Sequence, residues 1–277
     1  APRELIENEK ELLNSADLVF TGGQSLYEAK RDRHPSVHAF PSSIDFHHFA
    51  EARKLAANAE PEDQASIAHP RIGYCGVIDE RIDFDIIDGM AKARPDWQIV
   101  MIGPFAKVDP EQLPHHPNIH YLGQKEYKDL PKYLAGWDVA MMPFAINDAT
   151  KFISPTKTPE YLAAGKPVVS TAIRDVVRPY GELGLVSIAS TLDEFLRAAA
   201  SNGMDEGALP IDWLKNVDAF LGKNSWDRTW KEMAKLILQK GKEKTSHRLA
   251  REAEAGFFRD RNAEDNAEIT DISPDMA

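Results

Sequence analysis

The sequence predicts an α/β fold, a Rossmann-like parallel sheet with helices on both of its faces. Short apolar segments alternate with helical patterns along most of the chain, which is the order of elements in a parallel α/β sheet. Ile99–Ile102 and Val139–Met142 are apolar at every position, as expected for strands buried on both faces. Gly76, Gly103 and Gly123 each follow such a segment. Because the carboxyl ends of parallel strands meet at one edge of a sheet, these glycines are expected to line one crevice.

The boundaries of the elements follow from glycine, proline and capping residues. Strands are predicted at 71–75, 98–102, 118–122, 138–142, 167–170 and 184–188. Helices are predicted at 84–93, 128–136, 159–164, 173–181 and 192–201. These elements predict one main domain over residues 45–240.

A smaller β-α-β unit is predicted ahead of the main domain, over residues 1–44. It begins with a helix at 3–15, and two short strands follow at 17–21 and 37–40. A second helix, ending near Arg33, joins the two strands.

The end of the chain combines an apolar stripe with a charged tail. Trp226, Trp230, Met233 and Ile237 recur at helical spacing, which predicts an amphipathic terminal helix. Residues 241–277 are highly charged, and the last part of them is acidic. We therefore expect residues 241–277 to form a flexible tail.

Composition excludes several classes of protein. Lys and Arg number 33 against 44 Asp and Glu, a net charge of −11, whereas nucleic-acid binding needs a basic face. No apolar run approaches the roughly 18 residues that cross a bilayer, so no transmembrane segment is expected. Cys75 is the single cysteine. It excludes an internal disulfide, fits a reducing compartment and is expected to be a small buried residue.

The stretch 154–171 carries the candidate site. It reads as a loop, a short helix, a turn and a buried strand, with Thr158 as the helix cap and Gly165 as the stop. A cation, Lys157, and a carboxylate, Glu160, lie in the first turn. A cation suits phosphate, and a carboxylate would accept hydrogen bonds from a sugar diol, so the pair predicts a nucleotide ligand. Simple helix capping explains the same two residues equally well.

The segment Pro155–Val169 resembles the donor-nucleotide segment of the retaining glycosyltransferases of group 1 (family 4), which have the GT-B fold. The resemblance implies that Glu160 holds the ribose hydroxyls of a nucleotide diphosphate sugar. It also implies that the main domain is the C-terminal, donor-binding half of such an enzyme, and that residues 1–44 are a remnant of the N-terminal acceptor domain. The rest of that domain is missing from this chain, so we expect the chain alone to bind nucleotide without completing a turnover.

The same resemblance implies a reaction and a setting. A sugar would pass from a nucleotide diphosphate donor, UDP-linked, to a hydroxyl of a carbohydrate or lipid-linked acceptor, with retention. The setting would be the synthesis of bacterial surface polysaccharide or exopolysaccharide. A cytoplasmic protein, peripherally associated with the inner face of the membrane, is the corresponding expectation.

Further binding residues are expected around the glycine rim. Glycine at position 76 lets a phosphate approach the backbone, and Arg81 is predicted to neutralise the diphosphate together with Lys157. The resemblance implies that the nucleobase edge meets the backbone just after Gly123. The predicted substrate-binding residues are Gly76, Arg81, Gly103, Gly123, Gln124, Ile153, Ser154, Thr156, Lys157 and Glu160. No catalytic residue is assigned.

Two positions depart from the family pattern, and one of them is Val77, which occupies one of the two usual basic positions after the glycine. Phe152 stands where the family has the first of two glutamates, so the contact of that glutamate cannot be carried over. The backbone N–H groups of Ile153 and Ser154 are predicted to bind phosphate or sugar instead.

No metal and no other cofactor is expected. Asp83 and Asp85 have the spacing of the metal site of the other glycosyltransferase fold, GT-A, but they open a helix, where the dipole favours acidic residues. His115, His116 and His120 lie in a loop without neighbouring cysteines or carboxylates and are expected at the surface.

Two alternative functions stay open on the sequence alone. One is a nucleotide-sugar 2-epimerase with the GT-B fold, which would need acid/base carboxylates and histidines in the cleft. The other is a nucleotide-binding module without catalysis, which the missing first domain favours.

Overall fold

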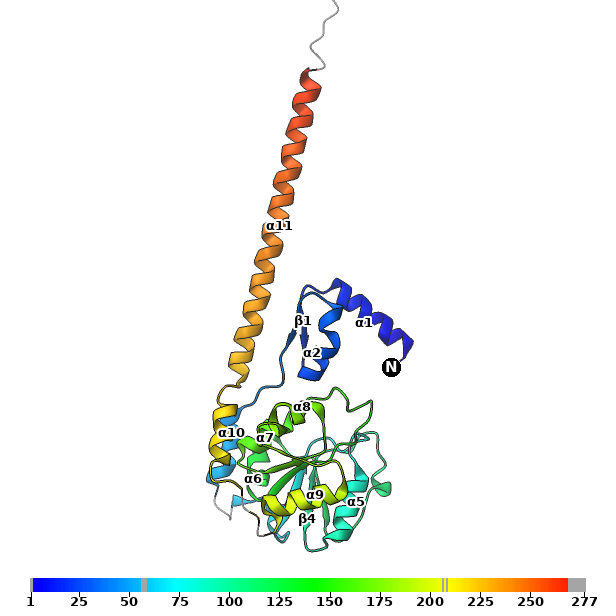
Figure 1. Ribbon diagram of the computed structural model, residues 1–277, viewed down its shortest axis with the longest axis vertical. Coiled ribbons are helices and arrows are strands. Elements are labelled where there is room, and N and C mark those ends of the chain that lie inside the picture. Colours follow the sequence, from blue (N-terminus) through cyan, green and yellow to red (C-terminus); the bar gives the residue numbers. More distant parts are fainter. Residues whose placement is uncertain (1, 56–58, 206, 208, 269–277) are drawn as a thin grey trace, which may run out of the picture. The chain divides into compact units, whose positions relative to one another are not determined.

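The structure of the protein is a computed structural model (Figure 1). It describes residues 2–55, 59–205, 207 and 209–268, with side chains as far as Leu249. The chain divides into two units, Ala1–Thr229 and Trp230–Ala277.

The first unit is built on a six-stranded parallel sheet with the order β5-β4-β3-β6-β7-β8. Its strands are β3 Arg71–Cys75, β4 Gln98–Ile102, β5 Ile119–Gly123, β6 Val139–Met142, β7 Val168–Ser170 and β8 Ser187–Ile188. The first five lie within one residue of the predicted strands. β8 is shorter than predicted because the N–H groups of Leu185 and Val186 donate to the carbonyl of Tyr180 instead of to the sheet.

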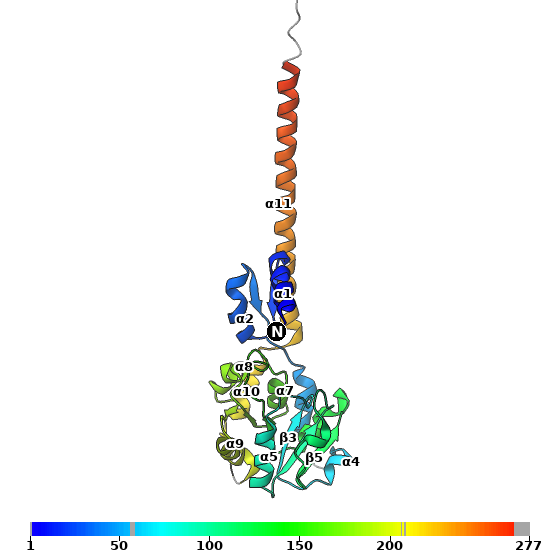
Figure 2. The same ribbon diagram turned by 90° about the vertical axis from the view of Figure 1, so that its right-hand side faces the viewer.

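Helices cover both faces of this sheet, as predicted (Figures 1 and 2). α5 Phe84–Ala93 packs against α9 Leu192–Ala199. α7 Lys157–Ala163 packs against α3 Phe46–Ala50 and α10 Trp213–Leu221, and α3 also contacts α6 Leu130–Ala135. From β3 the chain moves outward through β4 and β5, and then returns to place β6 on the other side of β3. The strand order therefore reverses between β3 and β6, which is where open α/β sheets bind ligands.

One predicted helix is broken. Residues 173–181 form only α8 Arg174–Val176, followed by a wider turn at Val177–Gly181. Arg178 is extended there, with φ −113° and ψ 120°, because a residue before proline is kept out of the helical region. A short helix that was not predicted, α4 Glu62–Ala65, precedes β3.

The N-terminal β-α-β unit is present as predicted. α1 Arg3–Ser15 leads into β1 Val19–Thr21, and α2 Gln24–Lys30 joins it to the parallel strand β2 Val37–Ala39. Contacts to the main domain come from α2, where the Ser25 N–H donates to Asp175 at 2.8 Å and Glu28 pairs with Arg174.

The helix of the candidate stretch, α7, begins earlier than predicted but stops at the predicted glycine. α7 begins at Lys157 with Thr156 as N-cap, so the prediction of Thr158 as cap is wrong. Thr158 is buried, and its hydroxyl donates to the Met142 sulfur at 3.3 Å. The stop at Gly165 is confirmed: its φ is +75°, and the N–H of Lys166 donates to the carbonyl of Tyr161, a Schellman motif.

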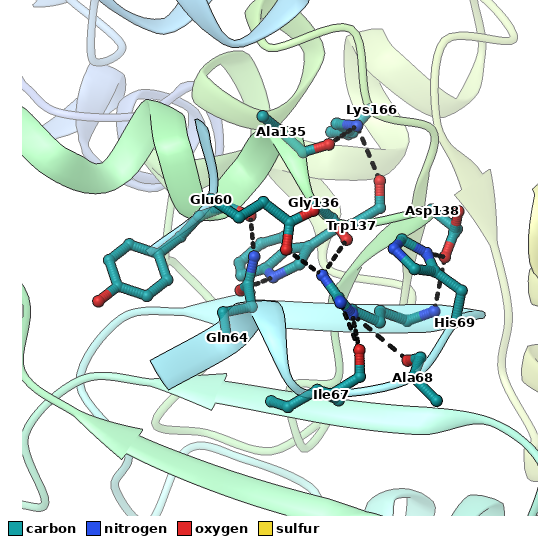
Figure 3. Close-up of polar contacts among 12 residues, drawn as sticks. Glu60, Gln64, Ile67, Ala68, His69, Ala135, Gly136, Trp137, Asp138 and Lys166 are labelled. Carbon is teal, nitrogen blue, oxygen red and sulfur yellow. Dashed lines mark hydrogen bonds and ion pairs between the residues drawn. The ribbon is translucent and has the colours of Figure 1, made fainter. Parts of the chain in front are cut away.

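A buried polar network holds the opposite, amino-terminal edge of the sheet (Figure 3). The Arg71 side chain is 3% exposed, and its guanidinium donates to Glu60 at 2.5 Å and to the carbonyls of Ile67 and Gly136. Gln64 extends this network by accepting a hydrogen bond from the Trp137 indole at 3.0 Å. These contacts tie the segment before β3 to the segment before β6.

The predicted terminal helix is α11, Trp226–Glu268. It continues as helix through Gly241, where the sequence suggested the start of a flexible tail, and residues 269–277 of that tail lie outside the described chain. Among the described residues, no helix is both long enough and apolar enough to cross a membrane.

Candidate nucleotide site

Three glycines meet at the carboxyl edge of the sheet. The Gly76 N–H donates to the carbonyl of Ile102 at 2.9 Å, and the Gly103 N–H donates to that of Gly123 at 3.0 Å. A Cβ at Gly103 would lie 1.8 Å from the Gly76 carbonyl oxygen, and its φ is +147°. Only glycine fits at position 103, so this rim is bare backbone that a ligand can approach closely.

The first turn of α7 is fixed beside this rim by Tyr161. Its buried hydroxyl accepts the Cys75 N–H at 2.7 Å and donates to the Cys75 carbonyl at 3.1 Å. β6 pairs with β3 only at Ile72 and Gly73. At Cys75, the Tyr161 hydroxyl therefore makes the backbone hydrogen bonds that a neighbouring strand would otherwise make. Cys75 is buried as predicted, and burial raises the pKa of its thiol to about 11.

Lys157 and Glu160 form an ion pair in that turn. Their Nζ and Oε2 atoms are 2.6 Å apart, and the side chains are 24% and 14% exposed. Burial raises the pKa of Glu160, while Lys157 opposes the shift. Burial therefore destabilises the ionised form of Glu160. Such a carboxylate is typical of functional sites and does not stabilise the fold.

Arg81 is bound to a residue that the sequence analysis overlooked. Its guanidinium donates to both carboxylate oxygens of Asp79, at 2.6–3.0 Å, and Asp79 is 7% exposed. The hydrogen bonds that Arg81 donates to Asp79 raise the pKa of Arg81. This pairing holds the guanidinium in place and compensates its charge, just as Glu160 compensates the charge of Lys157.

The other predicted residues lie in the loops that follow β5 and β6. Gln124 and Thr156 are exposed. Ser154 is half-buried against the N-terminal β-α-β unit: a Cβ added to Gly23 would lie 2.9 Å from the Cβ of Ser154. The Ile153 N–H donates to the carbonyl of Thr150 at 3.2 Å. That N–H is thus bonded within its own loop, so it is not free for the phosphate or sugar contact proposed for it.

Two aromatic side chains near Glu160 were missed by the sequence analysis. The His48 ring stacks on Tyr127, with centroids 4.4 Å apart and an angle of 15°, and Tyr127 is 53% exposed. Burial and then the Glu160 carboxylate raise the pKa of Tyr127. The only sequence signal was the position of Tyr127 shortly after Gly123.

The Asp83–Asp85 pair acts as a helix start. The Asp83 carboxylate accepts the Ile86 N–H at 3.2 Å and caps α5. Within the part of the chain that the structure describes, no group of three or more His, Cys, Asp or Glu side chains could hold a metal ion.

Comparison with known proteins connects this geometry to one family. Residues 69–201 match the family model of the group 1 glycosyl transferases. The chain is 26% identical over 243 residues to TuaH of Bacillus subtilis (strain 168), provisionally described as a teichuronic acid biosynthesis glycosyltransferase. That match covers 86% of this chain and 54% of TuaH, so the chain spans about half the length of this curated relative.

Solved structures share the fold at low sequence identity. HepE of Anabaena, in complex with UDP-glucose, superposes with a TM-score of 0.62 and 14% identity, over 86% of this chain and 68% of HepE. A glycosyltransferase from Rickettsia africae gives a TM-score of 0.64 and 12% identity, over 87% and 68% of the two chains. Sucrose-phosphate synthase from Thermosynechococcus elongatus gives 0.58 and 16%, over 86% and 62%. The structural neighbours are GT-B glycosyltransferases, and the chain shares their fold, while residues 69–201 are similar to the group 1 glycosyl transferases.

Proposed function

We propose that this chain binds the nucleotide diphosphate sugar, UDP-linked, of a retaining GT-B glycosyltransferase of family 4. The observation that carries the proposal is the partly buried Lys157–Glu160 pair, fixed by Tyr161 beside a glycine rim at the point where the strand order reverses. Ligands of open α/β sheets bind at such a point. A cation next to a desolvated carboxylate suits a ligand that combines a diphosphate with a ribose diol.

Several of the predicted residues then have a role in holding the donor. Glu160 accepts hydrogen bonds from the ribose hydroxyls, and Lys157 moves from Glu160 to the diphosphate. Arg81, held by Asp79, adds a second positive group. The glycine backbone at positions 76 and 103 lets the phosphates approach, and the exposed face of Tyr127 is available to the base.

The proposed reaction is transfer of the sugar to a hydroxyl of a carbohydrate or lipid-linked acceptor. Lys157 would stabilise the charge that develops on the leaving diphosphate, an electrostatic contribution that needs no metal. The likeness to TuaH supports a role in bacterial surface polysaccharide synthesis, and the UDP-glucose complex of HepE supports a UDP-linked donor. We propose that this sugar transfer takes place at the cytoplasmic face of the membrane.

Calorimetric titration of the chain with UDP, with and without EDTA, tests this proposal. We expect binding at one site, with the same affinity in EDTA, because side-chain cations neutralise the diphosphate. A loss of about tenfold or more on chelation, equal to about 1.4 kcal/mol, would contradict the assigned role of Lys157. No binding of UDP or of any nucleoside diphosphate would contradict the proposal as a whole.

A further inference from the structure

The amino end of α2 has no cap of its own. Its N-cap residue is Gly23, which has no side chain to accept the first N–H groups of the helix. An N-cap side chain normally accepts the N–H of the second or third helical residue. In this chain the N–H of Ser25, the second residue of α2, donates to Asp175 at 2.8 Å. The cap of α2 is therefore supplied by the main domain, from a residue 150 positions later in the chain.

Asp175 lies in α8, against which α2 packs (Figure 1). It is 6% exposed, and its second carboxylate oxygen, Oδ2, has no hydrogen-bond partner among the residues that the structure describes. One turn farther along α2, Glu28 pairs with Arg174 and lies 3.9 Å from Arg178. Because burying a carboxylate with one unpartnered oxygen is unfavourable, the stability of the fold alone does not explain this contact.

Gly23 brings the same end of α2 against the loop before α7. A Cβ added to Gly23 would lie 2.3 Å from Asp175 Oδ2 and 2.9 Å from the Cβ of Ser154. The φ of Gly23 is −164°, an extended conformation that any residue adopts, so the close approach is what requires glycine here. Gln24, Ser154 and Asp175 line one cavity of 140 Å³. The helix, its cap and the loop are thus in direct contact.

Ser154 is connected to the first turn of α7 by a stiff segment. Pro155 follows it, and α7 begins two residues later, at Lys157. The proline ring fixes the φ of Pro155 and restricts Ser154 to extended conformations. A shift of Ser154 is therefore passed on to Lys157 instead of being absorbed by rotation of the backbone between them. A displacement of about 1 Å is enough to weaken a contact that depends on position.

We propose that Asp175 is a positioning residue of the donor site. By capping α2 it holds the N-terminal β-α-β unit against Ser154, and this contact sets the position of Lys157 opposite the diphosphate. The inference rests on the proposed function, which assigns the diphosphate to Lys157 and the ribose to Glu160. It gives the N-terminal unit a part in donor binding: the unit contributes to the affinity for the diphosphate and not to the affinity for the nucleoside.

Titration of Asp175→Ala with UDP and with uridine tests the proposal. We expect the variant to bind UDP about tenfold more weakly than the unaltered chain, by calorimetry, and to bind uridine with unchanged affinity, by NMR titration. The nucleoside should be unaffected because Glu160 is next to Tyr161, which stays anchored to Cys75. Asp175→Asn keeps an oxygen that can accept the Ser25 N–H and should restore most of the affinity for UDP. A residue that acted only on stability would not separate the two ligands.

Two neighbouring glycines provide a matched pair of variants. Gly23→Ala places a Cβ against Asp175 and Ser154, and it should weaken UDP binding selectively, like Asp175→Ala. Gly22→Ala is the control, because a Cβ at Gly22 would meet no atom within 4 Å, and it should leave both affinities unchanged. The circular dichroism spectrum of each variant shows whether it is folded, and the pair measures the same contact even where Asp175→Ala does not fold.

Two results would overturn the inference. One is full affinity for UDP in both Asp175→Ala and Gly23→Ala. The other is an equal loss of affinity for UDP and uridine in these variants, which would indicate a general loosening of the main domain. Absence of UDP binding by the unaltered chain would instead contradict the proposed function, so the two failures are distinguishable.

Discussion

Replacing Arg71 with methionine is expected to lower the free energy of unfolding by about 3–5 kcal/mol. The change keeps an apolar stem of similar length but removes the guanidinium that pairs with Glu60 at 2.5 Å. The Glu60 carboxylate, 11% exposed, would be left without this partner, and the carbonyls of Ile67 and Gly136 would lose their donor. Breaking a buried pair on one side costs more than the pair itself contributes, because a desolvated charge remains.

Urea unfolding of two further variants controls this prediction. Lys128→Met breaks an ion pair with Glu126 whose side chains are 73% and 72% exposed, and it should change the free energy of unfolding little, because solvent screens an exposed pair. Combining Arg71→Met with Glu60→Leu should recover part of the loss, since the unpaired charge is then removed as well. If Arg71→Met unfolds like Lys128→Met, the network at the amino-terminal edge does not stabilise the sheet as we infer.

Replacing Glu160 with alanine is expected to weaken UDP binding by at least about tenfold, or 1.4 kcal/mol. Hydrogen bonds from two ribose hydroxyls to a carboxylate are charge-assisted, and each contributes about 1.5–3 kcal/mol. The matched control is Glu126→Ala, which removes an exposed carboxylate that is also paired with a lysine at 2.6 Å, and it should leave the affinity unchanged. Calorimetric titration of both variants makes the comparison.

The same site predicts an unusual effect on stability. The pKa of Glu160 is raised in the folded chain, so the folded state holds this proton more tightly than the unfolded state. The contribution of Glu160 to stability is therefore present at low pH and is lost as the pH rises through its folded pKa. Glu160→Gln should melt no lower than the unaltered chain at neutral pH. If Glu160 only favoured the helix dipole, the substitution would instead cost about 0.3–1 kcal/mol.

The sheet could be predicted because its strands are buried on both faces. β3 and β4 begin and end where the sequence indicated, and so does α5, because Asp83 caps it and an apolar strand follows. α10 was not predicted, since it is a short helix whose buried face depends on packing against α7. The break after Val176 was readable in principle, because Pro179 lies within the predicted helix.

The contacts of the candidate site were predictable between residues close in the sequence, but not between residues far apart in it. Lys157 and Glu160 share one helical turn, so their proximity follows from sequence spacing. The stacking of His48 on Tyr127 joins residues 79 positions apart, and no periodic pattern indicates such a contact. The pairing of Arg81 with Asp79 depends on the shape of the turn after β3, which the residue types alone did not fix.

The central claim, that Glu160 binds the ribose diol of the donor nucleotide, is tested most directly by a thermodynamic cycle. UDP and 2′-deoxy-UDP are titrated calorimetrically against the unaltered chain and against Glu160→Ala. We predict that loss of the 2′-hydroxyl weakens binding to the unaltered chain by at least about tenfold, but hardly affects the variant, because the acceptor of that hydroxyl is already gone. An equal loss of affinity in the two proteins would contradict the account.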